Sequence, residues 1–188
     1  YSEERRNKMD MKMTKPPLVS IITPSYNQGR FIEETIKSVL SQDYPNIEYI
    51  VVDGGSTDNT VEILKKYEGK LRWISEKDRG QSDAISKGFW MSKGEILAWL
   101  NSDDTYLPGA VSMAAKLLSI KQGIDMIYGK SYYTDESGKI IGEYPTGDFN
   151  FKTLATFNFI AQPSTFFKRN SYLEVKGLDL SLSYAMDY

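Results

Sequence analysis

Residues 47–58 read Ile47-Glu48-Tyr49-Ile50-Val51-Val52-Asp53-Gly54-Gly55-Ser56-Thr57-Asp58. The first six residues predict a β-strand, which stops abruptly at Asp53 with two glycines behind it. Residues 96–104 repeat the pattern, because an apolar run there ends in Asn101-Ser102-Asp103-Asp104. Ligands of open α/β sheets bind in the crevice outside the carboxyl ends of the strands. The two stretches therefore predict an α/β fold with carboxylates at its ligand-binding edge.

Outward from these stretches, short predicted strands alternate with helical periodicity, which is typical of βαβ units and a mostly parallel sheet. Strands are predicted at residues 18–23, 47–52, 71–75 and 96–100, and helices from near Ile32, Asp58, Ser82 and Gly109. Ser82 is the predicted N-cap of its helix. After residue 120 the pattern changes. Residues 126–133 and 139–143 predict a hairpin, and residues 164–168 and 170–175 predict a last strand and a short helix. This mixed last third is a reasonable place for a second substrate.

The composition restricts the chemistry. The 188 residues carry a net charge of −2, which argues against non-specific nucleic-acid binding, and they include no His and no Cys. The usual general base and the soft-metal ligands are therefore absent, so chemistry here must use carboxylates with a hard cation such as Mg²⁺ or Mn²⁺. No apolar run approaches the roughly 20 residues of a membrane span, and no signal peptide is visible. We expect a cytoplasmic chain.

The two ends suggest a fragment. Residues 1–16 are polar without periodicity and are predicted to form a tail, whereas residues 17–188 are predicted to form one domain. The chain starts at Tyr1 rather than Met, and it stops at Tyr188 without a closing helix. We therefore expect that a C-terminal portion is missing.

Each polar stretch has a structural reading beside the functional one. Asp103 and Asp104 could hold a cation against phosphates, or they could form a plain turn. Asp58 is expected to cap the helix that follows. Asp53, as a carboxylate that only accepts hydrogen bonds, would pair with an imide N–H of uracil or thymine and would be repelled by cytosine.

Two further loops carry the same ambiguity. Tyr26, after the first strand, could stack on a base or belong to an ordinary strand-to-helix turn. Residues 76–83 mix charges before a helix N-terminus. They could be a solvated loop, or they could contact a ribose or a diphosphate.

Together these segments resemble the inverting glycosyltransferases of the GT-A fold, the family-2-like bacterial polysaccharide-type sugar transferases. The matching stretches are Val19-Ser20-Ile21-Ile22-Thr23-Pro24-Ser25-Tyr26-Asn27, Ile36-Lys37-Ser38-Val39-Leu40-Ser41-Gln42, residues 48–58 and residues 100–104. Their order and spacing carry the resemblance over residues 18–188. It implies a GT-A-like, Rossmann-like fold, with a mostly parallel central sheet flanked by helices and a small mixed acceptor-side portion.

The resemblance also implies residue roles. Pro24 and Tyr26 would cradle the nucleotide base with Asp53 as its hydrogen-bond partner, and Arg79 and Asp83 would contact the nucleoside and diphosphate. Asn101-Ser102-Asp103 falls on the family's Asp-x-Asp motif. There Asp103 is the metal-binding carboxylate, Asn101 and Ser102 lie beside the donor, and Asn101 departs from the common Asp. Asp187, in Tyr184-Ala185-Met186-Asp187-Tyr188, would be the catalytic base, with Met186 where the family has Glu.

The implied activity is transfer of a sugar from a nucleotide-diphosphate donor, of UDP or dTDP type, to an acceptor hydroxyl, with Mn²⁺ or Mg²⁺ as cofactor. The acceptor would be a saccharide or lipid-linked saccharide in polysaccharide or glycoconjugate synthesis, reached at the inner face of a membrane. Two alternatives stay open. A sugar nucleotidyltransferase is disfavoured because residues 24–29 contain one Gly and no basic residue. A non-catalytic nucleotide-sugar-binding or assembly module is made plausible by Asn101 and the missing end.

Overall fold

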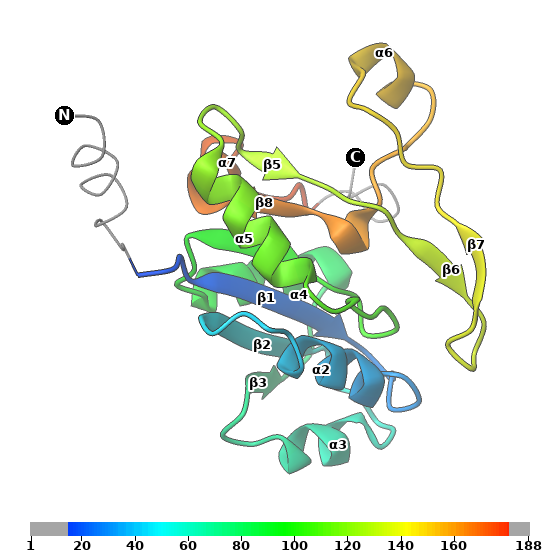
Figure 1. Ribbon diagram of the computed structural model, residues 1–188. Coiled ribbons are helices and arrows are strands. Elements are labelled where there is room, and N and C mark those ends of the chain that lie inside the picture. Colours follow the sequence, from blue (N-terminus) through cyan, green and yellow to red (C-terminus); the bar gives the residue numbers. More distant parts are fainter. Residues whose placement is uncertain (1–14, 181–188) are drawn as a thin grey trace.

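The computed structural model describes residues 15–180, and a six-stranded sheet lies at its centre (Figure 1). The strand order is β3-β2-β1-β4-β8-β5, and β6 pairs only with β7. The strands are β1 (Val19–Ser25), β2 (Ile47–Asp53), β3 (Arg72–Ser75), β4 (Ile96–Trp99), β5 (Met126–Ile127), β6 (Tyr132–Thr134), β7 (Ile140–Glu143) and β8 (Phe166–Lys168). The helices are α2 (Ile32–Leu40), α3 (Thr60–Lys66), α4 (Gln81–Met91), α5 (Ala110–Ile120), α6 (Phe151–Leu154), the 3₁₀ turn η1 (Gln162–Ser164) and α7 (Arg169–Glu174).

The first four strands are parallel, and their carboxyl ends meet at one edge. Ser25 lies opposite Asp53, and Ile22 lies opposite Trp99. Within the six-stranded sheet, β8 runs antiparallel to both of its neighbours, β4 and β5. The predicted α/β class with a mostly parallel central sheet is therefore confirmed, and the predicted strand ends share one edge.

Side chains of the strands alternate between two apolar layers. Ile21 packs in the layer that includes α2 and α5, whereas Ile22 packs in the layer that includes α4. Figure 1 shows α5 in front of the sheet and α4 behind it. α4 lies so close to β1 that a Cβ built on Gly88 would lie 2.3 Å from Cγ2 of Ile22. The lack of a side chain at this position therefore lets α4 pack directly against β1.

Two details differ from the sequence predictions. Residues 126–133 do not form one arm of a hairpin, because β5 joins the main sheet beside β8 and only β6 pairs with β7. α4 starts at Gln81, after Gly80 with φ 111°, so Ser82 is a helical residue rather than the N-cap. The first difference comes from a long-range contact, the pairing of β5 with β8. The second comes from the backbone conformation of Gly80. The local sequence pattern indicates neither.

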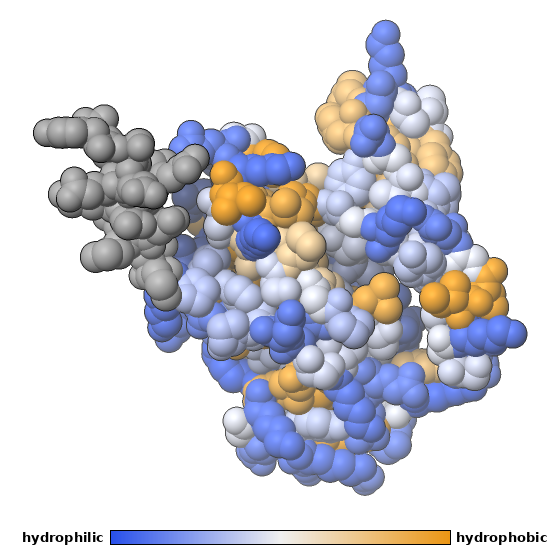
Figure 2. All heavy atoms as spheres, in the orientation of Figure 1, coloured by the Kyte–Doolittle hydropathy of each residue, from blue (hydrophilic) through white to orange (hydrophobic). Residues whose placement is uncertain are grey.

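The hairpin of β6 and β7 lies on the side of the sheet where the parallel strands end (Figure 1). Arg30 Nη2, from the loop after β1, forms a 2.5 Å ion pair with Glu136 at the hairpin turn. Figure 2 shows apolar side chains at the surface of this hairpin and of α6, where Ile141 is 66% exposed and Phe151 76% exposed. Among residues 15–180, no helix is both long and apolar enough to cross a membrane.

Candidate functional site

Backbone hydrogen bonds hold the residues that follow β2 and β4 to strand β1 at the sheet edge. Gly54 N donates to Ser25 O at 2.8 Å, and Leu100 N donates to Ile22 O at 2.8 Å. The predicted residues after these strands are thereby brought to one edge, as the sequence indicated. They come from positions 24–26, 53 and 101–103.

Asp53 ends β2 and is fully buried. Its carboxylate accepts hydrogen bonds from Ser56 N at 2.9 Å, Gly55 N at 3.2 Å and Ser75 Oγ at 2.6 Å, and from Ser56 Oγ. Asp53 therefore shapes the loop after β2 and fastens that loop to β3. Its predicted pairing with a nucleotide base stays a prediction.

Asn27 connects the loop after β1 to the loop after β2 by hydrogen bonds. Asn27 has φ 53°, its N–H donates to Ser56 Oγ at 2.7 Å, and its Oδ1 accepts from Thr57 N at 2.9 Å. Pro24 is buried at the end of the strand, while Tyr26 is 60% exposed. The ring of Tyr26 is therefore available to a ligand on a loop whose backbone is held in place.

Asp83, in the first turn of α4, is 9% exposed and lies among cationic groups. It accepts from Arg79 N at 3.1 Å and from Arg79 Nη2 at 3.2 Å, and Lys87 Nζ lies 3.4 Å away. Burial raises the pKa of Asp83, but the hydrogen bonds from Arg79 and Lys87 outweigh burial and leave the pKa below its ordinary value. Asp83 therefore positions Arg79, whose side chain is 77% exposed and free to meet an anion.

Asp103 and Asp104 follow β4, and the two carboxyls differ in exposure. Asp103 is exposed and Asp104 is half-buried. Burial, and then the charge of Asp103, raise the pKa of Asp104 to about 6, although a hydrogen bond from the Asn101 side chain acts in the opposite direction. Among residues 15–180 no three acidic, His or Cys side chains cluster as a complete metal site. One or two carboxylates are the usual protein share of a Mg²⁺ or Mn²⁺ site completed by phosphates, so this oxygen-only donor set fits such a cation.

Two side chains of α2 and one just after its C-terminus hold the loop after β4. Thr35 Oγ1 donates to Ser102 O at 2.9 Å and to Asp104 O at 2.8 Å. Ser38 Oγ accepts from Tyr106 N at 3.1 Å, and Gln42 Nε2 donates to Leu107 O at 3.0 Å. Sequence reasoning had assigned none of these roles. The available signal was a polar residue at i, i+3 and i+7 on the face of a helix that also carries Ile32, Ile36 and Val39.

Two glutamines that the sequence prediction missed hold Asn101. Gln81 Nε2 donates to Asn101 Oδ1 at 2.6 Å, and Asn101 Nδ2 donates to Gln162 Oε1 at 3.4 Å. Gln162 Nε2 in turn donates to Trp99 O at 2.8 Å. The first residue of α4, the acidic loop and η1 are thus joined side chain to side chain.

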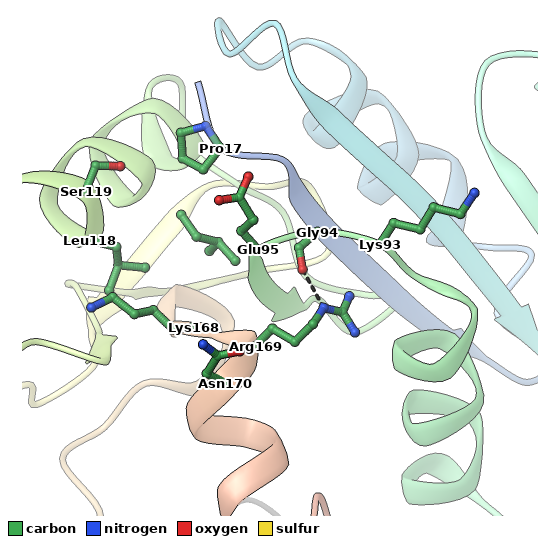
Figure 3. Close-up of a pocket in the computed structure, with 10 residues that line it drawn as sticks. Pro17, Lys93, Gly94, Glu95, Leu118, Ser119, Lys168, Arg169 and Asn170 are labelled. Carbon is green, nitrogen blue, oxygen red and sulfur yellow. Dashed lines mark hydrogen bonds between the residues drawn. The ribbon is translucent and has the colours of Figure 1, made fainter. Parts of the chain in front are cut away.

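A cavity of about 340 Å³ lies at the opposite edge of the sheet, beside the amino ends of β1 and β4. Figure 3 shows its lining, which includes Lys93, Glu95, Lys168 and Arg169. Arg169 Nε donates to Gly94 O at 2.6 Å and its Nη2 donates to Ser92 Oγ at 2.7 Å, so the guanidinium ties α7 to the end of α4. Of the predicted site residues within 15–180, none lines this cavity. Asp187, the predicted base, lies outside the described residues.

Comparisons with known proteins agree with this geometry. The chain is 34% identical over 182 residues to an uncharacterised glycosyltransferase of Mycobacterium tuberculosis, covering 93% of this chain and 68% of the relative. It is 38% identical over 125 residues to an uncharacterised glycosyltransferase of Rickettsia felis, covering 65% of this chain and 21% of the relative. The chain thus spans about a fifth of the length of the Rickettsia relative.

Solved structures show the same fold. Staphylococcus aureus TarS in complex with UDP-GlcNAc superimposes with a TM-score of 0.73 at 22% identity, over 90% of this chain and 51% of TarS. A mannosyltransferase from Pyrobaculum calidifontis, in complex with GDP-Man and Mn²⁺, superimposes with a TM-score of 0.67 at 22% identity, over 96% of this chain and 55% of that protein. The sequence profile described as "Glycosyl transferase family 2" matches residues 20–173. With this match over most of its length, the chain belongs to glycosyl transferase family 2.

Proposed function

We propose that this chain transfers a sugar from a nucleotide-diphosphate donor to an acceptor hydroxyl, with inversion at the anomeric carbon. The observation that carries the proposal is the convergence at one sheet edge of an exposed aromatic ring, an exposed guanidinium and an exposed carboxylate. These belong to Tyr26, Arg79 and Asp103. They match a base, a diphosphate and the cation that accompanies a diphosphate, and the family of the chain fits this reading.

For the donor, we propose a uridine or thymidine diphosphate sugar. Tyr26 would stack on the base beside Pro24, and Asp53 would accept from the imide N–H. Arg79, with Asp83 behind it, would meet the diphosphate. Asn101 and Ser102 would border the donor on the β4 side. The structural neighbours are complexes with UDP-GlcNAc and with GDP-Man, which supports a nucleotide-sugar donor without deciding the base.

For the cofactor, we propose Mn²⁺ or Mg²⁺ held by Asp103. The Mn²⁺ in the mannosyltransferase neighbour supports this choice. Such a cation would supply charge neutralisation for a diphosphate leaving group. The chain's own contribution is to present the Asp103 carboxylate on a loop that Thr35, Ser38 and Gln42 hold against α2.

For the chemical step, we propose Asp187 as the general base. Its carboxylate would take the proton of the acceptor hydroxyl as that oxygen bonds to the anomeric carbon. The bond from the anomeric carbon to the diphosphate oxygen breaks, and its electron pair leaves with the nucleoside diphosphate. One attack from the face opposite the leaving group inverts the configuration. The acceptor would be a saccharide or a lipid-linked saccharide, with synthesis at the inner face of a membrane.

The test is a panel of donors assayed for binding and for the product released. We expect UDP or dTDP, together with Mn²⁺ or Mg²⁺, to raise the midpoint of thermal unfolding, since ligands of the native state stabilise it. Incubation with the matching sugar nucleotide and saccharide acceptors should release the nucleoside diphosphate. Release of pyrophosphate from a sugar phosphate and a nucleoside triphosphate would instead identify a nucleotidyltransferase. Binding without turnover in any combination would identify a binding module.

A further inference from the structure

The side chain of Asn101 connects parts of the chain that are far apart in sequence. Gln81 comes from the start of α4, and Gln162 comes from the 3₁₀ turn η1 before β8. Both reach the Asn101 amide, one at its oxygen and the other at its nitrogen. The Asn101 side chain therefore contacts the donor side of the site and the last third of the molecule at once.

The orientation of every amide in this chain of contacts follows from one backbone group. Trp99 O is a carbonyl and can only accept, so the Gln162 group 2.8 Å from it must be the Nε2 amide nitrogen. Gln162 Oε1 then faces Asn101 and requires a donor there. Asn101 Nδ2 meets that requirement, which turns Asn101 Oδ1 toward the Nε2 of Gln81.

We propose that Gln81, Asn101 and Gln162 are positioning residues that form an amide ladder, and that this ladder requires asparagine rather than aspartate at position 101. The ladder holds residues 101–104 in the shape that receives the donor diphosphate, and it transmits that constraint to the segment carrying η1. The identity of the ligand in this inference rests on the proposed function. The ladder itself rests only on the hydrogen bonds of the three side chains.

An aspartate at position 101 would break the ladder at its link to Gln162. A carboxylate has no N–H, so Gln162 Oε1 would lose its donor. Turning the Gln162 amide over would not help, because Oε1 would then face Trp99 O, a second acceptor. Residues 101–104 would then lose their link to η1, so the loop that carries Asp103 would be held less firmly.

The first experiment measures binding of UDP in the presence of Mn²⁺ by calorimetry. We expect Asn101→Asp to weaken binding about 3–10-fold, the effect of losing about one hydrogen bond, even though it adds a carboxylate near the cation. Gln162→Met and Gln81→Met, which change no charge, should weaken binding by a comparable factor. Combining Asn101→Asp with Gln162→Met should cost less than the product of the two factors, because both variants break the same ladder.

The matched control is Asn170→Asp, which makes the same change of charge on an exposed residue beside the opposite-edge cavity. It should leave UDP binding unchanged. Equal or tighter binding by Asn101→Asp, or unchanged binding by Gln162→Met and Gln81→Met, would overturn the ladder and leave the proposed function standing.

The second experiment needs no ligand. Amide hydrogen exchange of the free protein should quicken at residues 101–104 and at the start of α4 in Gln162→Met, although the substitution lies in η1. Quickening confined to residues near position 162 would show that Gln162 is only locally structural, and would overturn the inference. If the unaltered protein binds no nucleoside diphosphate at all, the proposed function fails, and hydrogen exchange still decides the ladder.

Discussion

Asp103 and Asp104 are neighbours in sequence, yet the structure gives their carboxyls different surroundings. The half-buried Asp104 has a pKa of about 6 in the protein without a cation, against an ordinary value of 3.8. The native state therefore holds this proton more tightly than the unfolded chain does. Stability from this group is present below the ordinary pKa and is lost as pH rises through the native pKa.

The first prediction follows from this loss of stability with rising pH. In chelator-treated protein, the free energy of unfolding should fall by about 3 kcal/mol from this group between pH 4 and pH 6, then change little above pH 7. Asp104→Asn should remove that part of the slope and be more stable at pH 7. Urea unfolding at several pH values measures both. Parallel curves for the two proteins would show that Asp104 titrates normally.

A second residue-scale prediction concerns the base. If Asp53 accepts from an imide N–H, UDP should bind more tightly than CDP by about 1.5–3 kcal/mol, the range for a hydrogen bond to a charged group. Calorimetry with both nucleotides and the same cation measures the difference. Equal affinities would leave Asp53 with only the loop-shaping contacts to Gly55, Ser56 and Ser75.

The third prediction concerns Asp187. Asp187→Asn keeps the shape of the side chain but removes its ability to take a proton. Sugar transfer should fall about 10²–10⁴-fold, while donor affinity changes by no more than a few-fold. Rate and donor affinity are measured on the same variant. A normal rate would place the base elsewhere, and a loss of donor binding would make Asp187 structural.

At the scale of elements, side chains of α2 hold the loop after β4 in position. Thr35 is fully buried, and its hydroxyl contacts two carbonyls of that loop. The fourth prediction is that Thr35→Val, which has nearly the same shape, lowers the free energy of unfolding by about 1–3 kcal/mol, since two buried carbonyls lose their donor. It should also weaken binding of UDP with Mn²⁺.

The control for that prediction is Thr156→Val, whose exposed hydroxyl donates only to Thr153 O in its own turn. It should change stability by less than about 0.5 kcal/mol, as is usual for exposed positions. If Thr35→Val lowers stability without affecting UDP binding, α2 supports the fold but does not shape the site.

The elements show which parts of the fold a sequence can reveal. The alternation of strands and helices from β1 to α5 was predicted because each element carries its own local pattern and turn residues. The partner of β5 was not, because Met126 and Ile127 carry no mark of pairing with Phe167 and Phe166 rather than with residues 139–143. Strand pairing over such a separation is a property of the tertiary structure.

At the scale of the whole molecule, the same distinction applies to the site. The acidic residues were predicted because they end strands whose carboxyl ends must share an edge. Thr35, Gln81 and Gln162 were not, because each acts on a loop 20 to 67 residues away. A helical spacing can mark the face on which Thr35 lies, but it does not identify a partner so far away in the sequence. The residues proposed to touch the ligand are thus easier to predict from the sequence than the residues that hold their loops in place.

One consequence of the antiparallel pairing of β8 concerns synthesis of the chain. The outer edge of β4 is closed only when Ile96 pairs with Lys168 and Leu97 pairs with Phe167. At about 5–20 residues per second, a ribosome leaves that edge open for roughly 3–15 s after β4 emerges. An open, apolar strand edge is a template for pairing between chains. A chain that ends before Phe166 should therefore aggregate, as light scattering would show, at concentrations where the chain that includes β8 stays dispersed.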